Sequence, residues 1–120
     1  MRDHKKLRVF QLADSLALAI YRHTTSFPKA ECFGLTSQLR RAAVSVPSNI
    51  AEGFGRHYTA EYIHHLRFSN GSSNELQTQV ELSKRVEIVT AEEAAILVAD
   101  AEEIGRMLHG LIGSLERTSR

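Results

Sequence analysis

The sequence predicts an all-α protein folded as an antiparallel up-down-up-down four-helix bundle. Three observations lead to this prediction. Apolar residues recur at steps of three and four along four segments of the 120-residue chain. The segments that join them are short, so neighbouring helices should be antiparallel. No alternation of period two, the signature of a strand, is sustained anywhere.

The first predicted helix spans residues 9–26 and opens the bundle, which is predicted over 9–116. A basic N-terminal arm, residues 1–8, precedes it, and we expect this arm to be partly mobile. The helix ends at Phe27-Pro28, because the residue before a proline is pushed out of helical geometry. Its inner stripe consists of Val9, Ala13, Leu16, Ile20, His23 and Phe27.

The second predicted helix, residues 34–56, contains Pro47, which lacks a backbone donor and crowds the carbonyl of Ala43. Either the helix kinks there and continues, or Pro47 begins a separate short helix. The apolar stripe keeps its phase across Pro47, which favours the kinked, continuous helix. This stripe consists of Leu35, Leu39, Ala43, Val46, Ile50 and Phe54.

The third predicted helix, residues 59–87, begins at Thr59, a suitable N-cap. Its composition at 69–74, SNGSSN, is typical of a loop. The alternative is one long helix whose small side chains lie where another helix presses close. The stripe survives across this segment and favours the long helix. It consists of Tyr62, Leu66, Ser69, Ser73, Leu76 and Val80.

The fourth predicted helix, residues 90–116, opens with a capping box formed by Thr90 and Glu93. It has the most regular apolar spacing in the chain, at alternating steps of three and four, which is typical of the seam between nearly parallel helices. The seam consists of Ala94, Leu97, Ala101, Ile104, Leu108, Leu111 and Leu115.

Composition excludes several classes of protein. Apolar residues make up 42% and charged residues 24%, which is ordinary for a globular domain and unlike a disordered or membrane chain. We expect a cytoplasmic protein without a membrane partner, because there is no long apolar run or signal peptide and Cys32 is the only cysteine. The charge is uneven, since residues 1–60 carry nine Lys or Arg and four acids (+5), whereas 61–120 carry six and ten (−4).

We expect no catalytic residue, no metal site and no cofactor. Glu61 and His64 form a single Glu-x-x-His pattern, whereas di-iron bundles need two such patterns and two further glutamates. Ser45 and Ser48 have no histidine in the same helical turn to act as a base. We therefore expect the protein not to be an enzyme.

The polar side of the second helix is the strongest candidate for a site. Three interpretations remain open: a solvated face, an interface between subunits, or a surface that faces phosphates. The candidate interface residues are Arg41, Ser45, Asn49, Glu52 and Arg56. The candidate nucleic-acid contacts are Lys5, Lys6, Arg8, Arg40, Arg41 and Arg56.

The segment from Phe33 to Gly53, FGLTSQLRRAAVSVPSNIAEG, with Arg56, Gly71-Ser72 and Glu75-Leu76 after it, resembles a known family. This is the family of ribosomal-protein-like four-helix bundles encoded in intervening sequences of bacterial large-subunit ribosomal RNA genes. The resemblance implies a bundle that forms a homopentameric ring. It also implies a fold relationship to the accessory protein of diversity-generating retroelements, which is strongly basic, whereas this chain carries only +1.

Two functions follow as expectations. The first is a non-catalytic oligomer that binds ribosomal RNA or a ribonucleoprotein through a basic face of the first two helices. The second is a structural or protein-binding oligomer without nucleic-acid binding, in which oppositely charged surfaces of neighbouring subunits meet.

Overall fold

The computed structural model describes residues 3–118, and in this range the chain is helical and contains no strand. The four long helices are α1 (Arg8–Thr24), α2 (Leu35–Phe54), α3 (Thr59–Arg85) and α4 (Ala91–Thr118). Two short 3-10 helices, η1 (His4–Lys6) and η2 (Lys29–Glu31), precede α1 and α2. The predicted all-α class with four helices is therefore confirmed, and the predicted helix ends differ from the observed ones by at most two residues.

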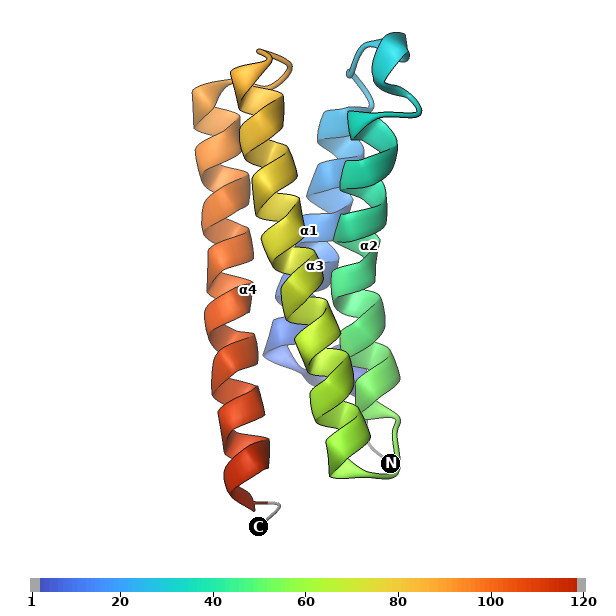
Figure 1. Cartoon of the computed structure of the whole chain (residues 1–120), viewed down its shortest axis with the longest axis vertical. Coiled ribbons are helices and arrows are strands. Elements are labelled where there is room, and N and C mark those ends of the chain that lie inside the picture. The colour runs from blue at the N-terminus through green and yellow to red at the C-terminus, as the bar shows by residue number, and fades with distance from the viewer. Residues whose placement is uncertain (1–2, 119–120) are drawn as a thin grey trace.

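The four helices lie side by side and form an elongated body of 48 × 21 × 20 Å. Successive helices are joined at alternate ends, as Figure 1 shows, so α1 and α3 run upward in that view and α2 and α4 run downward. Each helix packs against two others: α1 and α3 both contact α2 and α4. The core lies along the axis between them and includes Ile20, Ile50, Leu66 and Ile104, all of which are fully buried.

Helix α2 continues through Pro47 as a single helix, as the phase of its stripe indicated. Its first turn is capped from outside, because the Glu31 carboxylate accepts a hydrogen bond from Leu35 N (3.1 Å). Gly34 makes room for this cap, since a Cβ at that position would lie 2.7 Å from Glu31 Oε1. Glu31, four residues before Leu35, thus supplies a partner for the first backbone donor of the helix.

The serine-rich part of α3 is helical, and Ser69 and Ser73 in it are buried, which confirms the interpretation of 59–87 as one long helix. Ser69 Oγ donates to Val46 O on α2 (2.9 Å), and Ser73 Oγ donates to Ala101 O on α4 (3.0 Å). Both side chains are fully buried, so their small size brings two neighbouring helices close to α3. The hydroxyls have partners in those helices and incur no unpaired-group penalty.

At the N-terminal ends of α3 and α4, one expectation from the sequence is wrong and the other is confirmed. Thr59 is the first residue of α3, not its N-cap: Tyr58 holds that position without a side-chain hydrogen bond. The capping box of α4 is confirmed, since Glu93 N donates to Thr90 Oγ1 (3.0 Å) and Thr90 N donates to Glu93 Oε1 (2.8 Å). The turn between the two helices places Glu87 at φ 64, in the left-handed region.

Two further segments differ in detail from the sequence-based picture. Near the end of α4 the buried residue is Ile112, whereas Leu111 and Leu115 of the predicted seam are only partly buried. At the other end of the chain, His4–Lys6 of the predicted arm form η1, and the rings of His4 and Phe10 meet edge to face with centroids 4.8 Å apart. The first two residues of that arm lie outside the described residues.

Candidate interaction surface

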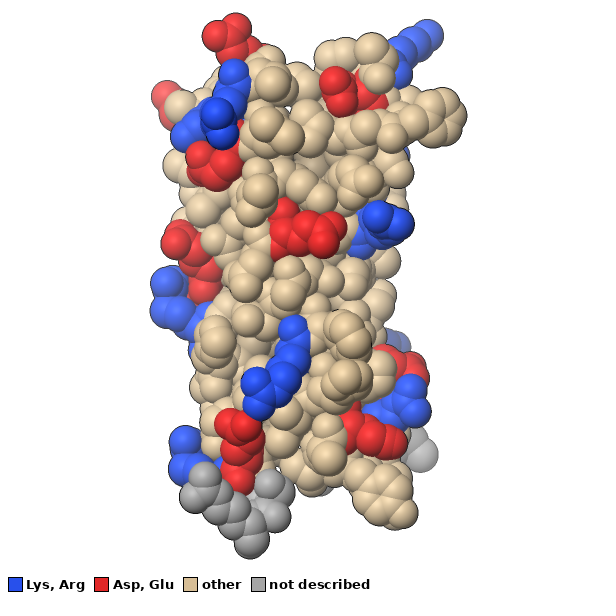
Figure 2. Space-filling view, viewed as in Figure 1, with Lys and Arg blue, Asp and Glu red and all other residues tan. Residues whose placement is uncertain are grey.

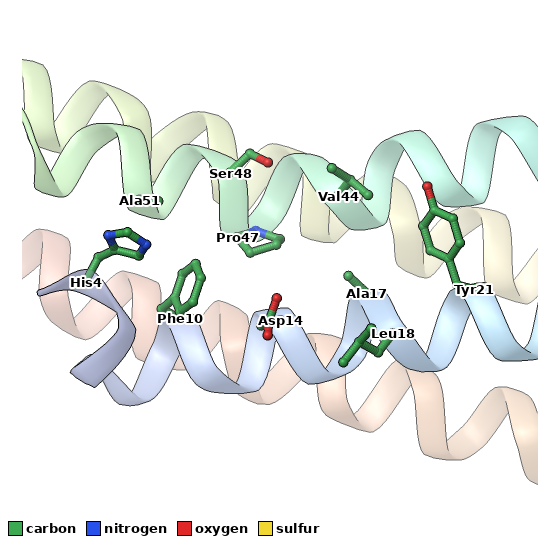
Figure 3. A pocket seen from close by; sticks show the side chains of 10 residues that line it. All are labelled: His4, Phe10, Asp14, Ala17, Leu18, Tyr21, Val44, Pro47, Ser48 and Ala51. Atoms are coloured by element: carbon green, nitrogen blue, oxygen red, sulfur yellow. The ribbon is translucent and has the colours of Figure 1, made fainter.

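An open groove runs along the outer face of the bundle between α1 and α2. It has a volume of about 390 Å³. Figure 3 shows that α1 contributes one wall and α2 the other, with the rings of Phe10 and Tyr21 towards its two ends. The lining residues are His4, Phe10, Asp14, Ala17, Leu18, Tyr21, Val44, Pro47, Ser48 and Ala51. All but three of these side chains are apolar or aromatic, so the floor of the groove offers contact area rather than a reactive centre.

Large apolar side chains in the groove are exposed to solvent. Leu18 is 51% exposed and Val44 is 40% exposed, although both lie on helices with a well-buried inner stripe. Two further hollows adjoin the groove: one reaches Phe33, which is 96% exposed, and the other reaches Lys5. Exposed apolar side chains that gather in one hollow are characteristic of a surface that another molecule covers.

Sequence reasoning missed this surface because it assigned one apolar stripe to each helix. The signal was a second row on the first helix, formed by Phe10, Leu18 and Tyr21, beside the inner stripe. Val44 on the second helix lies between two inner positions, Ala43 and Val46, and so lies off the inner stripe. A helix with two apolar rows has a wider apolar face than packing against the core alone requires.

Arg40 is one of the predicted nucleic-acid contacts, but its guanidinium is committed to α1. Its Nε donates to Thr24 Oγ1 (2.8 Å), and its Cζ lies 4.6 Å from the centroid of the Tyr21 ring. A second bond, from Nη2 to Tyr21 O, is longer at 3.4 Å. Arg40 therefore joins the end of α1 to the first half of α2 and lines the hollow that continues from the groove to Phe33.

The other predicted cationic contacts fall into two groups. Lys5, Lys6 and Arg8 lie at the N-terminal end of α1, and Arg56 lies just beyond the end of α2, while Arg41 lies in the opposite half of α2. Arg41 and Arg56 are fifteen residues apart, which is roughly 22 Å along a helix axis. This separation exceeds the Debye length of about 8 Å at physiological salt, so the groups act separately on a charged partner.

The residues predicted to form a subunit interface are divided between two environments. Arg41, Glu52 and Arg56 are exposed, and Arg56 Nη2 pairs with Glu52 Oε1 at 2.6 Å, as the i, i+4 spacing indicated. Ser45 and Asn49 are half-buried and take part in a hydrogen-bond network with α3.

That network joins four polar side chains between α2 and α3. Ser45 Oγ accepts from Asn49 Nδ2 (3.0 Å) and from Ser72 Oγ (2.7 Å), and Asn49 Oδ1 lies 3.2 Å from His65 Nδ1. The polar stripe on α2 therefore holds two helices of one chain together at these positions. Arg41 and Glu52 remain on the surface of α2, and Arg56 is exposed just beyond its end.

Within residues 3–118, no group of three or more His, Cys, Asp or Glu side chains is placed to hold a metal ion. His23 Nδ1 lies 3.4 Å from Glu93 Oε2, a pair at the boundary of the core. The hydrogen bonds from Thr90 to the Glu93 carboxylate lower the pKa of Glu93, and this group caps a helix. In the same described range, no helix is both long and apolar enough to cross a lipid bilayer.

The remaining surface in view carries charges of both signs. Figure 2 shows Lys and Arg interspersed with Asp and Glu over the face that α2, α3 and α4 present in this view. One ion pair joins α3 to α4, Arg67 Nη2 with Glu116 Oε2 at 2.7 Å. The α1–α2 groove is therefore the surface feature that most clearly points to a binding partner.

Fold and surface together define the class: an all-α four-helix protein with an exposed apolar groove on one side. The chain belongs to the 23S rRNA-intervening sequence protein family, whose model matches residues 5–110. A solved structure is also similar, with a TM-score of 0.79 and 25% identity over 87% of this chain and 97% of the other. It is a crystal structure of a protein of unknown function from the S23 ribosomal protein family of Bacteroides thetaiotaomicron VPI-5482. No curated protein shows significant similarity to this chain.

Proposed function

We propose that this protein is a non-catalytic helical bundle that acts by binding other macromolecules, beginning with further copies of itself. The observation that carries the proposal is the exposed apolar groove between α1 and α2, in which Leu18 and Val44 are about half in contact with water. Covering such side chains stabilises a complex by about 25 cal/mol per Å² of apolar surface removed from water. The family resemblance implies that five copies close into a ring.

Light scattering coupled to gel filtration tests this proposal directly. The chain has a mass of 13.4 kDa, and a ring of five copies would have five times that mass. A particle of 13.4 kDa at all concentrations tested would contradict self-association. An assembly of another closed size would support self-association and contradict the number five.

A second candidate function is binding of ribosomal RNA or a ribonucleoprotein. The observation that favours it is a group of exposed cations, Lys5, Lys6 and Arg8, with no ion pair among the described residues. Free cations are available to phosphates, whereas a cation already paired with a carboxylate must give up that partner first. The name of the family refers to 23S rRNA.

The test is binding of 23S rRNA fragments at several salt concentrations, with Lys6→Glu and Arg8→Glu as the variants. Affinity should fall as salt rises, with a logarithmic slope of about −0.7 to −0.9 per phosphate neutralised, and each variant should make the slope shallower. The matched control is Arg106→Glu on α4, which makes the same change of charge at a residue that is paired with Glu103. No binding at low salt, or binding that is insensitive to salt, would contradict this function.

A further inference from the structure

We propose that the α1–α2 groove of one copy receives the first half of α4 from the next copy, with Ile96 as the apolar anchor. This inference rests on the proposed self-association and names the two surfaces that meet. The inserted surface, called the α4 ridge here, consists of the exposed residues Glu92, Ala95, Ile96, Ala99, Asp100 and Glu103.

The α4 ridge has an apolar centre between acidic residues. Ile96 is 63% exposed, the largest exposure of any aliphatic side chain among the described large hydrophobic residues. Ala95 and Ala99 beside it are exposed and small, so they let the backbone of α4 approach a partner closely. Glu92, Ile96, Ala99 and Glu103 are spaced by four, three and four residues and therefore share one side of the helix.

Charge is the main reason for choosing a second copy as the occupant. The α4 ridge contains three acids, Glu92, Asp100 and Glu103, and no Lys or Arg, which gives a formal charge of −3. The groove and the two adjoining hollows contain three cations and one acid, Lys5, Arg40, Arg41 and Asp14, which gives +2. The two surfaces therefore carry opposite charges, and both expose apolar side chains.

The spacing of charge and apolar residues also agrees between the two surfaces. In the hollow that continues from the groove to Phe33, Arg41 precedes Val44 by three residues, which is about one helical turn. On the ridge, Glu92 and Asp100 each lie four residues from Ile96. When Ile96 rests against Val44, one of these two carboxylates reaches the level of Arg41. Neither acid forms an ion pair within the described part of its own chain, and the same holds for Arg41.

The two surfaces lie on different parts of one protomer, so the contact is head-to-tail. The groove belongs to α1 and α2, and the ridge belongs to α4, which does not contact α2. Each copy that offers its ridge to one neighbour still has its groove free for another. Contacts of this type build rings when the rotation between neighbours closes, and filaments when it does not.

Three variants with the same new side chain test this inference by light scattering. Val44→Glu places an acid in the groove, and Ile96→Glu places one at the centre of the ridge. Leu82→Glu is the matched control, because Leu82 is 44% exposed on α3, outside both surfaces. All three positions are exposed, so circular dichroism should show the same helix content as the parent protein. We expect the first two variants to be particles of 13.4 kDa and the control to assemble like the parent.

An equimolar mixture of the two monomeric variants provides the decisive measurement. The Val44→Glu chain keeps an intact ridge and the Ile96→Glu chain keeps an intact groove, so the mixture should form a dimer of twice 13.4 kDa and nothing larger. A mixture that stays monomeric would overturn the inference. So would an Ile96→Glu or Val44→Glu protein that assembles like the parent, since the occupant of the groove would then be a different molecule. A parent protein that is itself monomeric would instead contradict the proposed self-association.

Discussion

Replacing Gly53 by alanine tests the closest approach between α2 and α3. A Cβ at this position would lie 2.7 Å from His65 Cβ, 3.1 Å from Tyr62 Cδ1 and 3.2 Å from Tyr62 O. Carbon atoms pack best at about 3.5–4.0 Å, so the two helices would have to separate by roughly 1 Å. The nearest atom is a Cβ, which cannot move without its backbone.

Two opposing effects set the size of the change. Overpacking of this kind costs about 1–3 kcal/mol. The higher helix propensity of alanine offsets part of this destabilisation, because glycine is less favourable than alanine in a helix by up to about 1 kcal/mol. This gain is smaller at Gly53 than in a helix interior, since α2 ends at Phe54. We therefore expect Gly53→Ala to lower the free energy of unfolding by about 1–2 kcal/mol, measured by urea denaturation.

Gly71→Ala is the matched control, because it makes the same substitution inside α3 where a Cβ would have no neighbour within 4 Å. This variant should gain about 0.8–1 kcal/mol from helix propensity alone. The two variants should therefore differ by about 2–3 kcal/mol and shift the midpoint in opposite directions. All proteins must be compared at one concentration, because self-association adds to apparent stability. A Gly53→Ala protein as stable as the parent would refute the packing argument.

Further predictions concern the loops and the buried serines. Glu87→Gly should stabilise the protein by about 1 kcal/mol, because Glu87 has φ 64 and glycine adopts this conformation without strain. Thermal unfolding of the variant and the parent measures this change in stability. Ser69→Leu should cost about 2 kcal/mol or more, since Ser69 is fully buried, whereas Asn74→Leu at an exposed position should change stability by less than about 0.5 kcal/mol. Thr90→Ala should cost about 1 kcal/mol through loss of the cap, by urea denaturation at pH 7. The pKa of Glu93 is lowered by its bonds to Thr90, so its stabilising contribution is present above pH 4.5, the ordinary pKa, and is lost as pH falls through the folded-state pKa. Glu93→Gln should abolish that loss, measured as the difference in unfolding free energy between pH 7 and pH 3.

The helices could be predicted from the sequence, because burial of one helix face makes apolar residues recur with the helical period. Leu39, Val46 and Ile50 are fully or almost fully buried on α2, at the spacing that predicted them. The same phase argument carried α2 through Pro47 and α3 through its serine-rich segment. Local composition opposed both conclusions, and the requirement to keep one face buried over a whole helix outweighed it.

The interaction surface was less readable, because periodicity identifies what faces the core and not what the rest of the surface does. Arg40 and Arg41 are adjacent in sequence, yet Arg40 is bound to Thr24 and Tyr21 on α1 while Arg41 forms no ion pair within the described residues. Ser45 was grouped with surface residues, but its hydroxyl bonds Ser72 on α3. These partners are sixteen to twenty-seven residues away in the chain, so a local sequence pattern does not predict them.

The amino-acid sequence by itself determined the fold class, the four helices and the capping box at Thr90, because these depend on spacing and on contacts within a few residues. Only the tertiary structure decided that Gly53 is a point of close helix contact, that Ser69 and Ser73 bond two different neighbours, and that α1 and α2 leave a groove between them. The physical reason is that a helix has one inner face, which its sequence must mark with apolar residues. What its other faces meet depends on which helices the fold places beside them.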